Sequence, residues 1–176
     1  MRHLWLGFAI FAVAAFGTHY LVLKAIPSFV MSKARSTFQE RGMPLNYWVA
    51  SSRITPQTQT VVRPSPDLAY GICLFDVRDG PMLISAPTWD EYGSMSIFDD
   101  QTNNVFVTSL KTSDAAPTGI VVARPGQDLG AAVSDRPVVT LKGEGLALIR
   151  RLAPTAQTYA SAADLIAAAK CEPMTE

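Results

Sequence analysis

An uncharged run over residues 4–23 is the feature that most constrains what this chain can fold into. At about 1.5 Å of rise per residue, it forms a helix of about 30 Å, the thickness of the hydrocarbon core of a bilayer. Lys24 and Pro27 follow the run. The sequence therefore predicts a single-pass membrane anchor over residues 1–27.

A cleaved signal peptide is the alternative interpretation of this segment. Arg2 and the terminal amine make a short basic start, and residues 12–14, Ala-Val-Ala, resemble a cleavage site. Cleavage there would leave only residues 4–11 as the apolar stretch, whereas the hydrophobic character continues through Phe16 and residues 21–23. This continuation favours a retained anchor.

The rest of the chain has the composition of one folded unit. The chain has 176 residues, of which 48% are hydrophobic, and its 15 basic side chains balance 15 acidic ones. A neutral chain lacks the basic face that binds phosphates, so we expect no nucleic acid partner. The apolar content also excludes a disordered protein, and about 130 to 150 residues outside the anchor suffice for a domain with its own core.

Period-two patterns between turn residues predict a mainly β domain over residues 65–176. Residues 68–75 alternate most clearly, and the Asp-Gly-Pro sequence at positions 79–81 predicts a turn after them. Further strands are expected over residues 82–86, 92–98, 105–110, 119–123, 137–141 and 145–150. Such segments are typical of a sandwich or a barrel-like antiparallel sheet.

Helices are expected on both sides of this β region. The alanine-rich residues 161–170 predict a closing C-terminal helix, with Thr158 or Ser161 as its cap. Residues 28–64 are expected to form a juxtamembrane helix that ends at Gly42 and Pro44, followed by an extended, proline-containing linker.

Short motifs along the chain occur in the order of a known bacterial family. An Asp-x-x-Tyr segment at residues 67–70, the turn at residues 76–81, Tyr92 and the Asp-x-x-x-Asn segment at residues 99–103 follow one another. Together with the His and Pro that end the apolar helix, they resemble the family called domain of unknown function 1254, in its short, membrane-anchored branch. The resemblance implies a β-rich fold in the cell envelope of a Gram-negative bacterium.

The same resemblance implies a partner but no chemistry. Longer members of the family carry a companion domain, domain of unknown function 1214, and we expect a separate chain to supply it here. The resemblance brings neither a reaction nor a cofactor. The expectation is an uncharacterised, non-enzymatic binding or accessory module.

Polar side chains within the motifs are the candidate ligand-binding residues: Asp67, Tyr70, Tyr92, Asp99 and Asn103. In a shared pocket such carboxylates and hydroxyls can act as acids and bases, whereas tyrosines bonded to strand-end carboxylates would have a structural role. The alternative function, a carboxylate-dependent hydrolase acting with a partner domain, requires Asp67 and Asp99 to lie within reach of each other.

The rarity of histidine excludes most hydrolase templates. His3 and His19, the two histidines, both lie in the N-terminal segment, so a Ser-His-Asp triad or a zinc site in the domain is not expected. Residues 99–104 have the spaced oxygen donors of a calcium loop. However, Asn104 stands in place of the glycine and Leu110 in place of the final glutamate, so we expect no metal and no cofactor.

Two observations disagree about the side of the membrane. Four basic residues between positions 24 and 41 outnumber Arg2 before the anchor, which favours a cytoplasmic domain. A disulfide between Cys73 and Cys171, the only cysteines, would persist only in an oxidising compartment; two unrelated thiols are the alternative. With the envelope resemblance, the disulfide leads us to expect an inner-membrane protein with a periplasmic domain.

The neighbours Arg150 and Arg151 end a predicted strand. Adjacent strand residues face opposite sides, so they are not expected to clamp one anion together, and we expect one of them to pair with a carboxylate.

Overall fold

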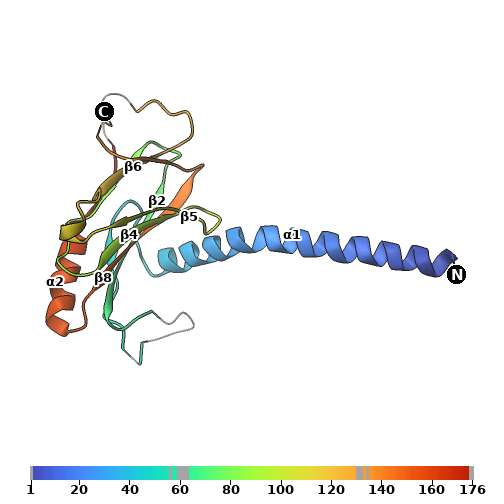
Figure 1. Cartoon of the computed structure of the whole chain (residues 1–176), viewed down its shortest axis with the longest axis horizontal. Coiled ribbons are helices and arrows are strands. Elements are labelled where there is room, and N and C mark those ends of the chain that lie inside the picture. The colour runs from blue at the N-terminus through green and yellow to red at the C-terminus, as the bar shows by residue number, and fades with distance from the viewer. Residues whose placement is uncertain (1, 56, 59–63, 130–132, 134, 175–176) are drawn as a thin grey trace.

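A computed structural model describes residues 2–55, 57–58, 64–129, 133 and 135–174. A long helix projects from one side of a β-rich domain, and a shorter helix lies on the opposite side (Figure 1). The elements are α1 (Arg2–Glu40), β1 (Val49–Ala50), β2 (Leu68–Asp76), β3 (Met82–Ser85), β4 (Gly93–Phe98), β5 (Asn104–Ser109), the 3₁₀ turn η1 (Thr112–Asp114), β6 (Gly119–Ala123), β7 (Val138–Thr140), β8 (Glu144–Leu152), α2 (Ala156–Ala167) and β9 (Lys170–Pro173).

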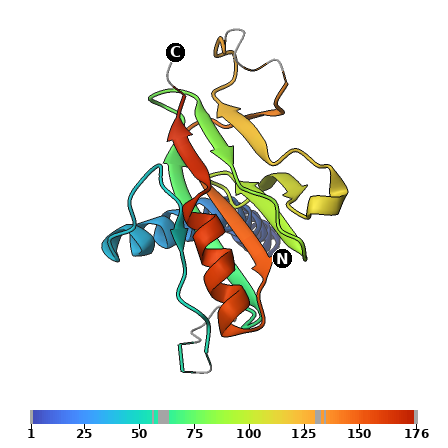
Figure 2. The same ribbon diagram turned by 90° about the vertical axis from the view of Figure 1, so that its left-hand side faces the viewer.

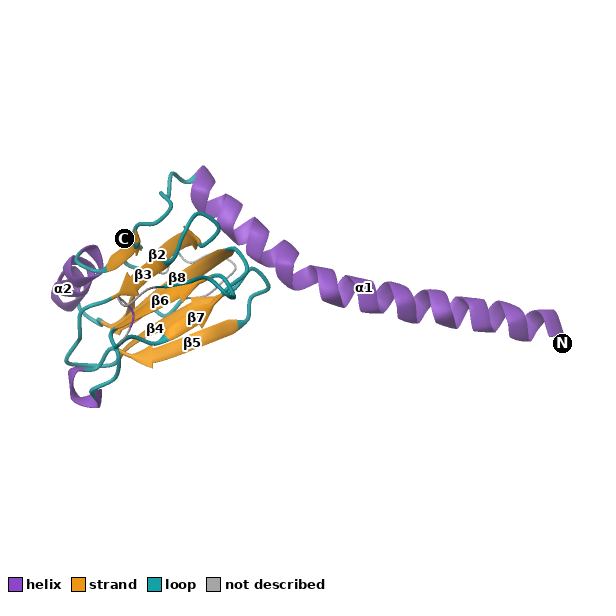
Figure 3. Ribbon diagram, turned by 90° about the horizontal axis from the view of Figure 1, so that it is seen from above, coloured by secondary structure: helices purple, strands orange, loops and turns teal. Residues whose placement is uncertain are grey.

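The strands form two sheets. The first has the order β1-β2-β8-β4-β5 and is antiparallel throughout, and Figure 3 shows β2, β8, β4 and β5 side by side. The second has the order β7-β6-β3-β9 and is mixed, because β6 and β7 run parallel. The predicted mainly β fold with a helix at each end is confirmed, and among the pairs of described strands the β6–β7 pair departs from antiparallel pairing.

The core lies between the two sheets. Residues of β8 alternate between buried and half-buried along its whole length, as expected for a strand with one face on a core. Cys73 and Ile149 from the first sheet belong to the same buried cluster as Ile84 and Ile120 from the second. Cys73 is joined to Cys171 of β9 by a disulfide with a Cα–Cα distance of 6.6 Å, so this bond connects the two sheets.

Helix α2 begins five residues earlier than the alanine-rich pattern predicts. Its N-cap is Thr155, whose side chain accepts a hydrogen bond from the Thr158 amide. The Thr158 hydroxyl in turn accepts a hydrogen bond from the Thr155 amide. Thr158 therefore completes a capping box rather than serving as the cap. The predicted cap at Ser161 is wrong, since this residue lies inside the helix. In Figure 2, α2 lies in front of the strands and α1 behind them.

The contact between α2 and the first sheet requires a glycine. A Cβ atom on Gly71 of β2 would lie 2.7 Å from Cγ2 of Ile166, which is fully buried. The helix ends at Ala167, and β9 follows where the sequence predicts further helix. Pairing with β3, which aligns Cys171 with Ile84, accounts for this strand.

Helix α1 continues without a break through Pro27 to Glu40. Its apolar part is exposed, whereas Met31 and Arg35 are buried against the domain. Gly42, at φ 80°, follows the helix end in the left-handed conformation that glycine adopts readily. The helix predicted after the anchor is thus the end of α1, and β1 lies where the sequence predicts a linker. Residues 56 and 59–63 of that predicted linker lie outside the described residues.

Candidate functional site

The two predicted carboxylates lie at opposite ends of the first sheet. Asp67 precedes β2 at the end that pairs with Leu152, and Asp99 follows β4 at the end that pairs with Leu146. Leu146 and Leu152 are six positions apart on β8, about 20 Å at 3.3 Å per residue. The carboxylate pair that the hydrolase alternative requires is therefore not formed.

Several of the candidate ligand-binding residues make local hydrogen bonds. The hydroxyl of Tyr70 accepts a bond from the Ser65 amide at 2.8 Å. One carboxylate oxygen of Asp99 accepts bonds from the amides of Gln101 and Asn103, both at 2.8 Å, and the other accepts from the Asn103 side chain at 2.7 Å. The contacts of Asp99 close the turn between β4 and β5, as Asx side chains commonly do.

Tyr92 lies in a different place, a shallow open groove of about 580 Å³ beside the ends of β4 and β5. We call it the β4–β5 groove; it is lined by Glu91, Tyr92, Gly93, Ser94, Val107, Thr108, Ser109, Lys111, Asp114 and Leu152. The hydroxyls of Tyr92 and Ser94 lie 3.2 Å apart. Of the five candidate residues, Tyr92 alone lines the groove, whose volume is typical of ligand sites.

One carboxylate in the β4–β5 groove is held in its charged form. The hydroxyls of Ser109 and Ser113 donate hydrogen bonds to Asp114 and, with the nearby charge of Lys111, lower the pKa of its carboxyl. The groove thus presents one cation, Lys111, and two carboxylates, Glu91 and Asp114, next to the exposed apolar side chain of Val107. This mixture suits a polypeptide segment better than an ion of one sign.

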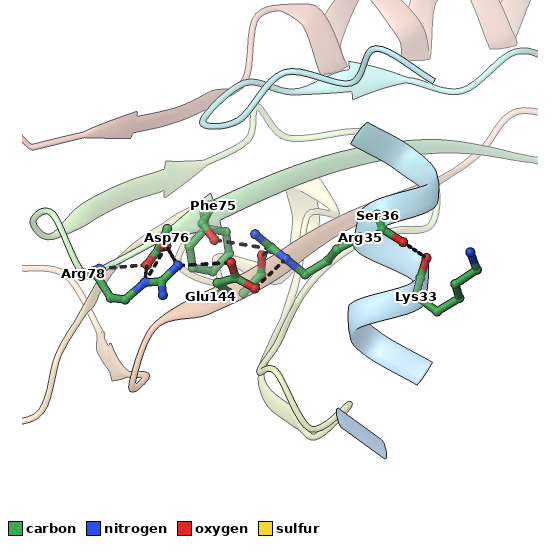
Figure 4. A network of polar contacts seen from close by, with 8 residues as sticks. Lys33, Arg35, Ser36, Phe75, Asp76, Arg78 and Glu144 are labelled. Atoms are coloured by element: carbon green, nitrogen blue, oxygen red, sulfur yellow. Dashed lines mark hydrogen bonds and ion pairs between the residues drawn. The ribbon is translucent and has the colours of Figure 1, made fainter. Parts of the chain in front are cut away.

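The junction between α1 and the domain is built on Arg35, which is 4% exposed (Figure 4). Its guanidinium donates hydrogen bonds to the carbonyl oxygens of Gly145, at 2.5 Å, and Phe75, at 3.5 Å. Its Nε lies 3.1 Å from Oε2 of Glu144. One helix side chain therefore holds the backbones of both β2 and β8.

The polar network extends from Glu144 to the turn after β2. Arg78 lies 3.1 Å from Glu144 and also forms an ion pair with Asp76, as Figure 4 shows. The hydrogen bond from Arg78 lowers the pKa of Asp76. We find no signal for this network in the sequence, because Arg35 and Glu144 are 109 positions apart.

A second buried arginine lies at the far end of β8. Arg151 is fully buried, donates to the Pro87 carbonyl at 2.6 Å and lies 5.9 Å from the Trp89 ring centre. Within the described residues, its Nε and Nη1 have no hydrogen-bond partner, and burial lowers its pKa to about 10. The expected pairing of one of these arginines with a carboxylate is not found for Arg151 in the described part of the chain.

Comparisons with other proteins identify a family and a fold. The profile of a family described as protein of unknown function (DUF1254) matches residues 45–173. No protein with a curated description matches the chain. The crystal structure of the VPA0106 protein from Vibrio parahaemolyticus is similar with a TM-score of 0.60 and 17% identity, over 84% of this chain and 35% of that one. The chain thus spans about a third of the length of that solved protein, and the likeness concerns the fold alone.

Proposed function

The chain belongs to the DUF1254 family of proteins of unknown function, and from this premise we propose that it is a membrane-anchored envelope protein whose β domain binds a protein partner. The observation that carries the proposal is α1, a single helix that is apolar and exposed at its start and fixed to the domain by Arg35 at its end. In this proposal the protein has no catalytic role of its own.

Retention of the anchor is supported by the exposed surface of α1. The helix is long and apolar enough to cross a membrane, and none of its apolar window is buried by the domain. Trp5 lies near its start, and Tyr20 and Lys24 lie next to each other toward the end of the apolar part, with 5.8 Å between the ammonium and the ring. Aromatic and basic side chains at both ends are typical of membrane-spanning helices.

Cleavage at residues 12–14 would leave a large apolar surface uncovered. Phe16 and Leu21 would remain on a helix that is joined to the domain, and they are 76% and 67% exposed. A bilayer covers such a surface, whereas water does not. A cleaved signal peptide is therefore the less favoured interpretation.

The structure supports a domain that stands close to the bilayer. The apolar run ends at Lys24, and Met31 is the first fully packed side chain of α1. Lys24 and Met31 are seven positions apart, about 10 Å along the helix axis. With Arg35 fixing the helix, we propose that the domain is held at the level of the lipid headgroups.

We place the domain in the periplasm and the anchor in the inner membrane. The Cys73–Cys171 disulfide supports this placement, since such bonds persist in oxidising compartments. The basic residues after the anchor count against it less than their number suggests, because Arg35 is buried and paired with Glu144.

The partner we propose is a separate protein, and the resemblance implies one from the companion family, domain of unknown function 1214. The separation of Asp67 from Asp99 favours binding over hydrolysis.

A C-terminal reporter that is active only outside the cytoplasm tests the location. The full chain is expected to resist carbonate extraction, to keep its N-terminus and to give an active reporter. A soluble mature protein that lacks its first dozen or so residues would overturn the anchor. An inactive reporter on an intact membrane protein would overturn the periplasmic placement alone.

A further inference from the structure

We propose that the partner binds by adding an extended segment to the free edge of β5, with side chains of that segment in the β4–β5 groove. The inference rests on the proposed binding function and names the surface and the form of the partner. It follows from three features: the edge itself, the direction of its backbone groups, and the groove beside it.

Among the four described sheet edges, β5 is the longest, and the bulge at its start is its one protecting device. Strands β1 and β7 have two and three residues, and β9 carries Lys170, Glu172 and Pro173. Short strands, charges and prolines are what protect natural edges from further pairing. Strand β5 has six residues, Asn-Val-Phe-Val-Thr-Ser, with neither a charge nor a proline.

The backbone of β5 offers hydrogen bonds on its outer side. The amide of Leu110 donates to the Gly93 carbonyl at 2.9 Å, so the backbone groups of this residue face β4. Because these groups alternate in direction along a strand, those of Ser109 and Val107 face away from the sheet. Val107 is 62% exposed, whereas the neighbouring Thr108 is buried and its hydroxyl donates to the Pro117 carbonyl at 2.9 Å, so solvent reaches this edge at Val107.

The usable part of the edge is short and lies beside the β4–β5 groove. A bulge between Ile97 and Phe98 disturbs the pairing at the start of β5, which leaves residues 106–109 between the bulge and η1. A stretch of this length favours a single extended segment over a second copy of the whole sheet. In an added strand, every second side chain would lie on the same face as Val107, where Tyr92, Ser94 and Leu152 line the groove.

The test uses a photoreactive p-benzoylphenylalanine in place of Glu91, an exposed residue at the rim of the groove. The full chain is expressed in its own host and irradiated in intact membranes, with three backgrounds: otherwise unchanged, Val107→Pro and Val138→Pro. Proline at position 107 removes an outward amide and leaves the bonds to β4 in place. A discrete adduct with an extended segment of another protein is expected, and it should fall about tenfold or more in Val107→Pro.

Val138→Pro is the matched control on the other sheet. Val138 is a 44% exposed edge valine, and the Val121 amide bonds to the Pro137 carbonyl, so the amide of Val138 also faces outward. The adduct is expected to persist in this variant, and equal melting temperatures establish that both variants fold.

The remaining outcomes separate the two proposals. An adduct that is unchanged in Val107→Pro would overturn strand addition while leaving partner binding in place. An adduct with twice the mass of the chain would replace the partner with a second copy. No adduct in any background would overturn partner binding at this surface.

Discussion

Replacing Arg35 by methionine tests whether α1 and the β domain form one unit. Methionine has a similar length and fills the same space, but it has no group to donate to the carbonyls beneath the helix. The substitution would leave the Gly145 carbonyl without this donor, and Glu144 would lose one of its two cationic partners. We expect Arg35→Met to destabilise the domain.

The expected magnitude comes mainly from the backbone contacts. A hydrogen bond from a charged donor contributes about 1.5–3 kcal/mol. The ion pair to Glu144 adds at most about 1 kcal/mol, because that carboxylate is 43% exposed to solvent. The sum is about 2–4 kcal/mol, or about 5–15 °C in melting temperature for a domain of this size.

Urea titration of the full chain in detergent micelles, followed by tryptophan fluorescence, measures this loss. Trp48 is buried in the domain and reports its unfolding. Lys33→Met is the matched control, since Lys33 lies on the same helix with an exposed side chain. If the two variants differ by less than about 0.5 kcal/mol, the carbonyls have other donors and the argument for a fixed junction fails.

Three other features of the domain can be tested by melting curves. The disulfide joins cysteines 98 positions apart, so Cys73→Ala with Cys171→Ala is expected to cost about 2–5 kcal/mol, and an unchanged melting temperature would contradict this. Gly71→Ala is expected to cost about 1–3 kcal/mol by collision with Ile166, and the cost should shrink in an Ile166→Ala background; equal costs in both backgrounds would refute the collision. Because the pKa of Asp76 is lowered in the folded protein, its carboxylate stabilises the fold at pH values above the ordinary carboxyl pKa. This stabilisation is lost as the pH falls below about 4. Asp76→Asn should therefore reduce the loss of stability in acid, and identical acid titrations of the two proteins would refute this.

Strands with a strong local signal could be predicted from the sequence. The alternation over residues 68–75 and the turn residues after it correspond to β2 and its turn, and the prediction for residues 119–123 has the bounds of β6. Strands β1 and β9 could not be found in this way, because they exist through pairing with β2 and β3 rather than through a pattern of their own.

The polar junction is the part that the sequence conceals. Arg35 has the same local context as any basic residue that follows a long apolar segment. Its burial depends on how α1 packs on β2 and β8, and its partner Gly145 in β8 is 110 positions away. The environment of Arg151 could be predicted in part. Strand alternation predicts that Arg150 and Arg151 face opposite sides, but the pattern gives no indication that the inward one lacks a carboxylate partner among the described residues.

Strand β8 connects α1 to the proposed binding surface. Its first residue, Glu144, pairs with Arg35, and its last, Leu152, lines the β4–β5 groove. Pairing with β2 and β4 covers most of the strand on both sides, and its eight steps measure about 26 Å. Because the helix is held at one end of a strand that is paired on both sides, the fold sets the position of the β5 edge relative to α1. In the anchored arrangement that we propose, it therefore also sets the height of this edge above the bilayer. A partner in the same membrane would therefore meet this edge at a constant distance from the lipid surface.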